Sequence, residues 1–435
     1  MDLLKNKRET GDSIAAAFQD KEALKREIIA GITAFFTISY IIIVNPMILA
    51  DAGIPADLSV FATVFVSVIG CLLVGIFADA PLVLTPGMGV NAFFTYTVVV
   101  NMGRTWQEAI AVSLCASLIY VIVAMTRLSS LLAKAVPGSL KVGITAGIGL
   151  FLVEIGLEKA GLITAGDASI LTLGSLQNPE TLLALFGLVL SLAFYVRKVP
   201  GGFFLGILII SLMNYLLGLP QASMPTVELG TISRYGQLLG AADFSRMASI
   251  PFVLAVFSMT MILVFESMGI IEGLLEDQTK FKKTFAVSAI TSFLSGFFGT
   301  SPTVVAAESA AGIGSGGRTG IMALTAGVLF ALSLFFIPLL SYVPSAAVAP
   351  VIIITGAIMM QQLQHIPFDD FSEWFPAFLI IVLIPLTGSI SSGLAFGFAS
   401  YPLLKIFAGR IQGMHPLCYV LALLFILDLV CNTIV

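Results

Sequence analysis

A succession of long apolar stretches constrains this chain more than any other feature. Most of them approach the roughly 20 residues that a helix needs to cross a bilayer. In the first half they cover 28–50, 58–77, 82–100, 107–125, 138–157, 181–196 and 201–218. In the second half they cover 250–271, 283–298, 302–313, 318–337, 346–362, 374–390 and 391–408. Seven predicted spans therefore lie on either side of a polar connector, 219–248. An extra apolar segment occupies 416–434.

The composition agrees with a membrane protein. Charged residues make up 11% of the 435 residues, whereas soluble domains carry about 25%. Apolar residues make up 58%, more than a soluble chain of this length could bury while covering itself with polar groups. We therefore exclude a soluble enzyme, a disordered chain and a nucleic-acid binder. The four cysteines form no CxxC pair, so we expect no disulfide framework, no metal site and no cofactor.

The basic residues predict the orientation. Residues 1–27 are polar and lack the apolar stretch of a cleaved signal peptide, so we expect a cytoplasmic arm. With this arm inside, seventeen of the 21 Lys and Arg residues fall on the cytoplasmic side. The connector 219–248 is then extracellular. Because seven is odd, a second half built like the first would lie inverted in the bilayer.

Two of the predicted spans, 82–100 and 302–313, are interrupted or flanked by Pro and Gly residues. Each is the third span of its half, and broken segments at corresponding positions point to the binding site of a transporter. Irregular backbone at this depth must line a cavity or be buried in protein. We expect Val83–Thr85 and Thr303–Val305 to form short strands that pair and satisfy each other's backbone groups.

Few ionisable groups fall inside the apolar stretches, and such groups usually mark function. Glu266 lies deep in the eighth segment, with no basic residue within ten positions. Glu308 follows the break of the tenth segment, and Asn91 follows the break of the third. A packing role is the alternative for Glu266 and Asn91, and an interfacial position at a segment end is the alternative for Glu308. Glu154 and Asp428 lie near segment ends, where an interfacial role is favoured.

Five stretches, in order along nearly the whole chain, carry a family pattern. They are ITAFFTISYIIIVNP (32–46), TPGMGVNAFFTYTVV (85–99), KVGITAGIGLF (141–151), GTSPTVVAAESAAGIGSGGRTG (299–320) and DFSEWFPAFLIIVLIPLTGSISSGLAFGFASY (370–401). Together they resemble the nucleobase:cation symporter-2 family, specifically its AzgA-like permeases for adenine, guanine and hypoxanthine. The stretch 299–320 is the most specific.

The resemblance implies an all-α polytopic membrane protein of fourteen segments in two inverted repeats, 28–218 and 250–408. Segments one to four (28–125) and eight to eleven (250–337) would form a core domain. Segments five to seven (138–218) and twelve to fourteen (346–408) would form a gate domain. Short strands in segments three and ten would flank the substrate site. Family members are typically proton-coupled importers of the plasma membrane, and related structures are often homodimers.

The resemblance also assigns roles to residues. The family's segment-eight acid falls on Glu266, its segment-ten Glu on Glu308 and its segment-three Asn on Asn91. One departure concerns the first of these, because the branch usually has Asp there and this chain has the longer Glu. After this acid the branch usually reads GTLIG, where this chain reads GIIEG (269–273). Near the end of the chain the branch usually has a polar group, where this chain has SSG (391–393).

The resulting hypothesis is proton-coupled purine uptake by alternating access. Glu266 would bind the base and carry the coupled proton, since a low-dielectric cleft disfavours the charged form of a carboxyl group. Glu308 and Asn91 would orient the base. Backbone N–H groups near Ala307 would add contacts. Phe36 or Phe94 could stack on the ring, although packing is the favoured role for any one of the 33 phenylalanines.

Other functions are weighed against this one. A symporter of the same fold could carry another nucleobase: xanthine, urate or uracil. A small anion is disfavoured, because two carboxylates would repel it. No HExxH, GxSxG or Walker motif supports a membrane enzyme. A channel is disfavoured because the polar groups cluster at one place rather than along a pore.

Overall fold

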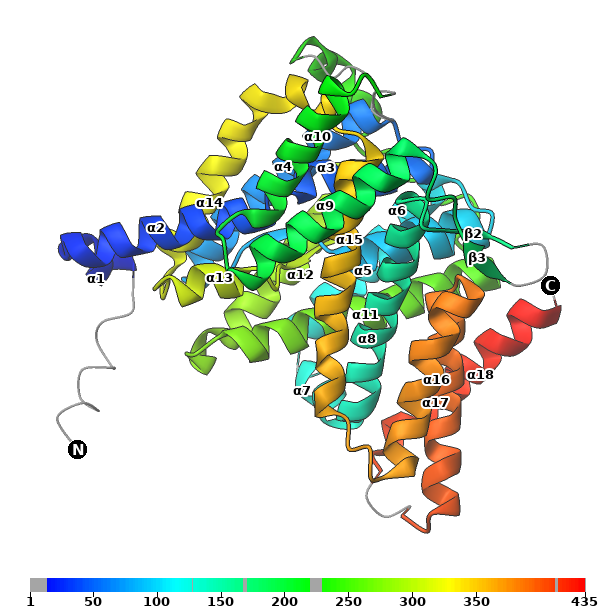
Figure 1. Cartoon of the computed structure of the whole chain (residues 1–435). Coiled ribbons are helices and arrows are strands. Elements are labelled where there is room, and N and C mark those ends of the chain that lie inside the picture. Colours follow the sequence, from blue (N-terminus) through cyan, green and yellow to red (C-terminus); the bar gives the residue numbers. More distant parts are fainter. Residues whose placement is uncertain (1–13, 127, 167–169, 220–228, 411–413, 435) are drawn as a thin grey trace.

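The structure, a computed structural model, describes residues 14–126, 128–166, 170–219, 229–410 and 414–434 (Figure 1). The beginning of the predicted arm, residues 1–13, and residues 220–228 of the predicted connector lie outside these ranges. The described part of the chain is mostly helical, and four three-residue strands interrupt its helices.

The elements of the first half are α1 (Ile14–Gln19), α2 (Lys21–Ile38), α3 (Ile41–Asp51), α4 (Ala56–Leu73), η1 (Val74–Ala78), β1 (Leu84–Pro86), α5 (Met88–Ala92), η2 (Phe93–Asn101), α6 (Trp106–Met125), α7 (Leu128–Ala135), α8 (Gly138–Lys159), β2 (Ile163–Ala165), β3 (Leu171–Leu173), α9 (Pro179–Val196) and α10 (Gly202–Leu216). Those of the second half are η3 (Leu229–Gln237), α11 (Ile250–Leu274), η4 (Gln278–Lys280), α12 (Phe281–Phe297), β4 (Thr303–Val305), α13 (Ser309–Gly314), α14 (Gly320–Ser333), η5 (Leu334–Tyr342), α15 (Ser345–Met360), η6 (Gln361–His365), α16 (Phe371–Thr387), α17 (Ile390–Phe407) and α18 (Pro416–Ile434).

The predicted spans coincide with these elements. Within the described ranges, nine helices are long and apolar enough to cross a membrane, and three further apolar helices are shorter. The first span begins at Lys21, inside the predicted arm, where the Asp20 side chain accepts a hydrogen bond from the Glu22 N–H and caps the helix. The extra segment 416–434 is the helix α18, which packs against α17 and α11.

The two broken segments meet through their strands. β1 pairs with β4 in antiparallel register, with Thr85 opposite Val304. The predicted pair of strands is therefore confirmed, although the first strand begins one residue later than expected. A Cβ atom at Gly87 would lie 2.5 Å from Cγ2 of Val304, so only glycine fits this crossing without a shift. The exposed hairpin of β2 and β3 is not predicted by the sequence pattern.

The first segment also contains a break that the sequence does not predict. α2 ends at Ile38 and α3 starts at Ile41, with Ser39 and Tyr40 between them. The Ser39 N–H still bonds to the carbonyl oxygen of Phe35 at 2.7 Å. The Tyr40 carbonyl accepts from the N–H of Val44 at 2.9 Å and so opens the next helix. Neither Pro nor Gly stands at this break.

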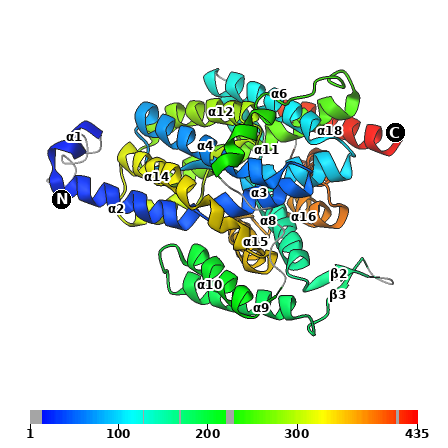
Figure 2. The same cartoon turned by 90° about the horizontal axis from the view of Figure 1, so that it is seen from above.

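The helices pack into two groups. In one group, α14 packs against α2 and α4, while α6 packs against α11 and α12. In the other group, α8 packs against α15 and α16, and α9 packs against α10 and α15. Figure 2 shows α9 and α10 on one side of the molecule and α12, α4 and α6 on the other. The β1–β4 pair belongs to the first group, since it packs against α4, α11 and α12.

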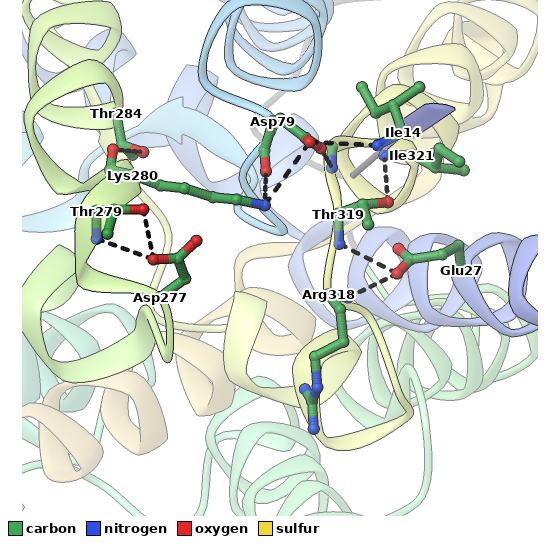
Figure 3. A network of polar contacts seen from close by, with 11 residues as sticks. Ile14, Glu27, Asp79, Asp277, Thr279, Lys280, Thr284, Arg318, Thr319 and Ile321 are labelled. Atoms are coloured by element: carbon green, nitrogen blue, oxygen red, sulfur yellow. Dashed lines mark hydrogen bonds and ion pairs between the residues drawn. The ribbon is translucent and has the colours of Figure 1, made fainter. Parts of the chain in front are cut away.

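A polar network joins the helix ends of the first group (Figure 3). The Asp79 carboxylate accepts from the N–H of Gly320 at 2.7 Å and lies 3.7 Å from Nζ of Lys280. The carboxylate of Glu27 accepts from the N–H groups of Arg318 at 2.8 Å and Thr319 at 3.1 Å. These bonds satisfy N–H groups at the start of α14, which otherwise lack partners within the helix.

Candidate functional site

A cavity of about 340 Å³ lies where the broken segments meet the second helix group. This volume is within the range of small-molecule sites, roughly 300–1,000 Å³. The lining comes from the break between α2 and α3, from β1, α8, α11 and α15, and from the turn after β4. Its polar members are Tyr40, Thr85, Lys141, Thr145, Glu266, Glu308, Thr355 and Gln362.

Glu266 reaches this cavity from α11. Its Oε2 atom is buried and has no hydrogen-bond partner among the described residues. A Cβ atom at Gly89 would lie 3.2 Å from this oxygen and 3.0 Å from Cγ2 of Ile148. The missing side chain at Gly89 is therefore what leaves room for the carboxylate beside the start of α5. A buried acceptor without a partner is costly, which is typical of a group that awaits a ligand or a proton.

Glu308 reaches the same cavity from the turn between β4 and α13. The hydroxyl of Tyr40 donates a hydrogen bond to its Oε1 atom. Ala307, the residue before it, is exposed and also lines the cavity. The structure thus brings Glu266, Glu308 and Ala307 together, as the sequence pattern leads one to expect for a single polar cleft.

Asn91 lies outside the cavity lining, in α5. It is fully buried, and neither atom of its side-chain amide has a hydrogen-bond partner in the part of the chain that the structure describes. Its backbone N–H bonds to the carbonyl oxygen of Gly87 at 2.8 Å, one turn earlier. Met88 and Gly87 of this turn line the cavity, so Asn91 stands behind its wall.

The two aromatic residues expected to stack on a ligand lie elsewhere. Phe36 is 40% exposed on the outer face of α2, with its ring 6.3 Å from that of Phe204. Phe94 is fully buried in the core of the first group. Neither lines the cavity. The aromatic residues that do are Tyr40 and Phe265, and Nζ of Lys141 lies 5.7 Å from the centroid of the Phe265 ring.

Sequence reasoning missed the roles in the lining of Tyr40, Lys141 and Thr355. A tyrosine inside an apolar stretch is typical of packing, and its contact with Glu308 joins residues that lie 268 positions apart. Lys141 lies at the edge of its apolar stretch, where a basic residue is typical of the cytoplasmic boundary of a membrane span. Both residues stand in the stretches that carry the family pattern, 32–46 and 141–151, which is the one signal that could have found them.

Comparison with known sequences gives one family match. The sequence model of the family Xan_ur_permease, which is described as a permease family, matches residues 25–396. The chain is 44% identical to the nucleobase transporter PlAzg2 of Paenibacillus larvae over 87% of this chain and 77% of the relative. It is 37% identical to the guanine/hypoxanthine permease PbuO of Bacillus subtilis, over 94% and 98%. It is 33% identical to the adenine permease AdeP of Escherichia coli, over 93% of each.

Solved structures with a similar fold are more distant in sequence. The transmembrane domain of the cyanobacterial bicarbonate transporter BicA has a TM-score of 0.62 at 19% identity, over 87% of this chain and 98% of that chain. The murine anion transporter Slc26a9 in its inward-facing state has a TM-score of 0.63 at 15% identity, over 93% and 70%. At these identities the likeness concerns the fold alone.

Proposed function

The chain belongs to this permease family, and we propose that it imports purine nucleobases across the plasma membrane by proton-coupled alternating access. Membership makes it a multi-pass membrane transporter and not an enzyme. The named substrates of its relatives, which include guanine, hypoxanthine and adenine, support a purine. A comparison of the uptake of adenine, guanine and hypoxanthine identifies the preferred base.

The observation that carries this proposal is the pair of carboxylates, Glu266 and Glu308, in the lining of one cavity. A purine presents N–H donors and ring-nitrogen acceptors along its edges. A carboxylate accepts from N–H groups, and a protonated carboxyl can also donate to a ring nitrogen. Two carboxyl groups from different segments can therefore bind a flat, uncharged heterocycle from two sides.

Glu266 is the coupling group in this proposal. Its Oε2 atom has no hydrogen-bond partner among the described residues, whereas Glu308 accepts a hydrogen bond from the Tyr40 hydroxyl. A carboxylate without a partner in a low-dielectric site gains most from taking up a proton. Protonation at Glu266 then accompanies binding of the base, and its release accompanies delivery.

The two helix groups supply the moving parts. We assign the group of α2–α6 and α11–α14 to the core domain, and that of α8–α10 and α15–α17 to the gate domain. Their two inverted repeats and the fourteen crossings are part of this proposal. The cavity lies between the groups and reaches Lys141 in the first turn of α8. Under the orientation predicted by the basic residues, this end of α8 is cytoplasmic, so the described state is inward-facing.

An anion is a poor alternative cargo. BicA and Slc26a9, named for bicarbonate and anion transport, have a similar fold. A negative substrate would meet both Glu266 and Glu308 in this cavity, and Lys141 is the one described lining residue with a cationic side chain. Repulsion from two carboxylates in a low dielectric would outweigh attraction to one cation.

Uptake measurements test the proposal. Radiolabelled adenine, guanine and hypoxanthine are offered to a permease-deficient strain that expresses the wild type, Glu266→Gln or Glu154→Gln. Glu154 is a matched control, because it also has a buried oxygen without a partner in the described chain but does not line the cavity. We expect Glu266→Gln to lose proton-driven accumulation and Glu154→Gln to retain it.

Two results would contradict the proposal. Accumulation that survives in Glu266→Gln, and still collapses with the proton gradient, would remove Glu266 from the coupling role. Wild-type uptake of none of the three bases would remove the purine. Competition by unlabelled xanthine, urate and uracil then decides whether another nucleobase is the cargo.

A further inference from the structure

Three structural properties distinguish Tyr40. It occupies the break between α2 and α3, it lines the cavity, and it is fully buried. Its hydroxyl donates to Oε1 of Glu308. We propose that Tyr40 is a positioning residue, which holds the Glu308 carboxylate in the orientation that binds the base. This inference rests on the proposed function and adds a determinant of affinity to it.

The hydrogen bond makes the two carboxylates unequal. A donor to an ionised carboxylate forms a charge-assisted bond, which is stronger than a bond between neutral groups. Glu308 therefore stays an oriented acceptor, while Glu266 has no such donor at Oε2 among the described residues. An acceptor that is already held loses less side-chain freedom when the base binds, so the same contact yields a higher affinity.

The position of the hydroxyl is itself set by the fold. The ring of Tyr40 packs edge-on against Phe203 of α10, with centroids 5.9 Å apart and planes at 83°. Phe203 in turn stacks on Tyr195 of α9, also at 5.9 Å, with planes at 5°. The backbone on either side is fixed by the end of α2 and the start of α3. These contacts orient the ring, and its hydroxyl meets the Glu308 carboxylate.

Removal of the hydroxyl alone tests this role. Tyr40→Phe keeps the ring and its contact with Phe203. Calorimetry on the full chain in detergent measures the dissociation constants of adenine, guanine and hypoxanthine, and the base that binds the wild type most tightly is used for the comparison. We expect its dissociation constant to rise roughly tenfold or more, the loss typical of a hydrogen bond to a charged group. In uptake assays we expect KM to rise while the maximal rate stays within about twofold, a split that general misfolding would not produce.

A matched control separates this effect from the loss of any buried tyrosine hydroxyl. Tyr235 is 6% exposed, and its hydroxyl donates to the carbonyl oxygen of Phe298 at 2.7 Å. It does not line the cavity. Tyr235→Phe should leave the dissociation constant unchanged. Equal losses of affinity in the two variants would overturn the proposal.

A double-mutant cycle tests whether Tyr40 acts through Glu308. Glu308→Asp withdraws the carboxylate by one methylene from the Tyr40 hydroxyl. In that background Tyr40→Phe should weaken binding by less than about twofold, because the two changes break the same contact. A full, additive loss would overturn the proposal. If Tyr40→Phe does not fold, Glu308→Asp alone must lose affinity to a similar extent, and undiminished binding would have the same meaning.

Failure of this inference differs from failure of the proposed function. A wild type that binds no purine refutes the function itself. A wild type that binds a purine, beside a Tyr40→Phe variant with unchanged affinity, leaves the function standing and refutes only the role of Tyr40.

Discussion

The Glu266 carboxylate owes its room to a neighbouring glycine. Gly89 lies against the Oε2 atom of Glu266 and against Ile148. Nothing in the backbone demands glycine there, since Gly89 belongs to a regular helical turn and is not among the residues with positive φ. Its absent side chain is therefore best understood as space for the carboxylate and for whatever binds it.

A methyl group at this position should disturb the site more than the fold. In Gly89→Ala the new Cβ atom would lie 3.2 Å from Oε2 of Glu266 and 3.0 Å from Cγ2 of Ile148, so both neighbours must give way. We expect the KM for purine uptake to rise several-fold, with a loss of stability of about 1–3 kcal/mol. Gly314→Ala is the control, because a Cβ atom there meets nothing within 4 Å. Equal KM values for both variants and the wild type would contradict this account.

At the scale of residues, the scarcity of charged side chains predicted residues that line the cavity, whereas aromatic character did not. Glu266 and Glu308 stand out because so few ionisable groups lie in the apolar stretches, and the structure places both in one cavity. Phe36, one of 33 phenylalanines, carried no such distinction, and it lies on the outer face. Tyr40 stands in an apolar stretch, and no local pattern marks its contact with Glu308.

At the scale of elements, hydrophobic length and Pro–Gly breaks predicted most of what the structure contains. The strands in the two broken segments were predictable because β-branched residues stood where a helix could not continue. The break in the first segment was not, because Ser39 and Tyr40 have no strong preference against a helix. The contacts of the Tyr40 ring with Phe203 join residues far apart in the sequence, so no local pattern could predict them.

The start of α16 carries a charge cluster that makes stability depend on pH. A hydrogen bond from Ser372, together with the cations Lys405 and Arg410, holds the pKa of Asp370 below its ordinary value of 3.8. Nζ of Lys405 lies 3.6 Å from Oδ2 of Asp370, and an Arg410 nitrogen lies 2.5 Å from it. This stability is fully present above the ordinary value and is lost as the pH falls through the lowered one.

Thermal unfolding of the purified protein measures this dependence. Asp370→Asn keeps an oxygen that can cap α16 but removes the charge. We expect the melting temperature of the wild type to exceed that of the variant at neutral pH, and the gap to narrow as the pH falls below about 3.8. A gap that stays constant over this range would show that the ionised carboxylate contributes nothing.

At the scale of the whole molecule, the cavity and an ion pair stand at opposite ends of α8. Lys141 lines the cavity near the first turn, and Lys159 ends the helix, roughly 27 Å away at 1.5 Å per residue. Nζ of Lys159 lies 2.6 Å from Oδ2 of Asp51, which also accepts from the Tyr96 hydroxyl at 2.6 Å. This cluster ties the proposed gate domain to the proposed core domain at the end away from the cavity mouth.

Loss of that ion pair should favour opening at its end of the molecule. Lys159→Gln leaves Asp51 without its cation, whereas Lys159→Arg preserves the charge. Thr97 follows Tyr96 in the sequence, is buried, and accepts from the N–H of Ile390 at the start of α17. A cysteine in place of Thr97 reports opening through its reaction with an impermeant maleimide. We expect labelling to rise by up to about fivefold with Lys159→Gln, given the usual strength of exposed pairs. Unchanged labelling would mean that other contacts keep this end closed.

The arrangement of the two groups shows how far sequence carries at this scale. Apolar length alone predicted a chain of many membrane-spanning helices. Which helix packs on which could not be predicted in this way, because that choice depends on the shape of each face. Close approaches such as Gly149 against Gly356 bring α8 and α15 together, and no periodic pattern marks either glycine.

The pairing of β1 with β4 also governs how the molecule can be made. Val83, just before β1, donates its N–H to the hydroxyl of Ser309 at 2.9 Å, and the two residues lie 226 positions apart. When only the first half of the chain has been synthesised, the backbone groups of β1 therefore lack their partners in β4. That strand must be sheltered, by the translocation machinery or by neighbouring helices, until synthesis reaches residue 305. The lining of the cavity runs from Ile38 to Gln362, so an intermediate that ends before Gln362 lacks part of it.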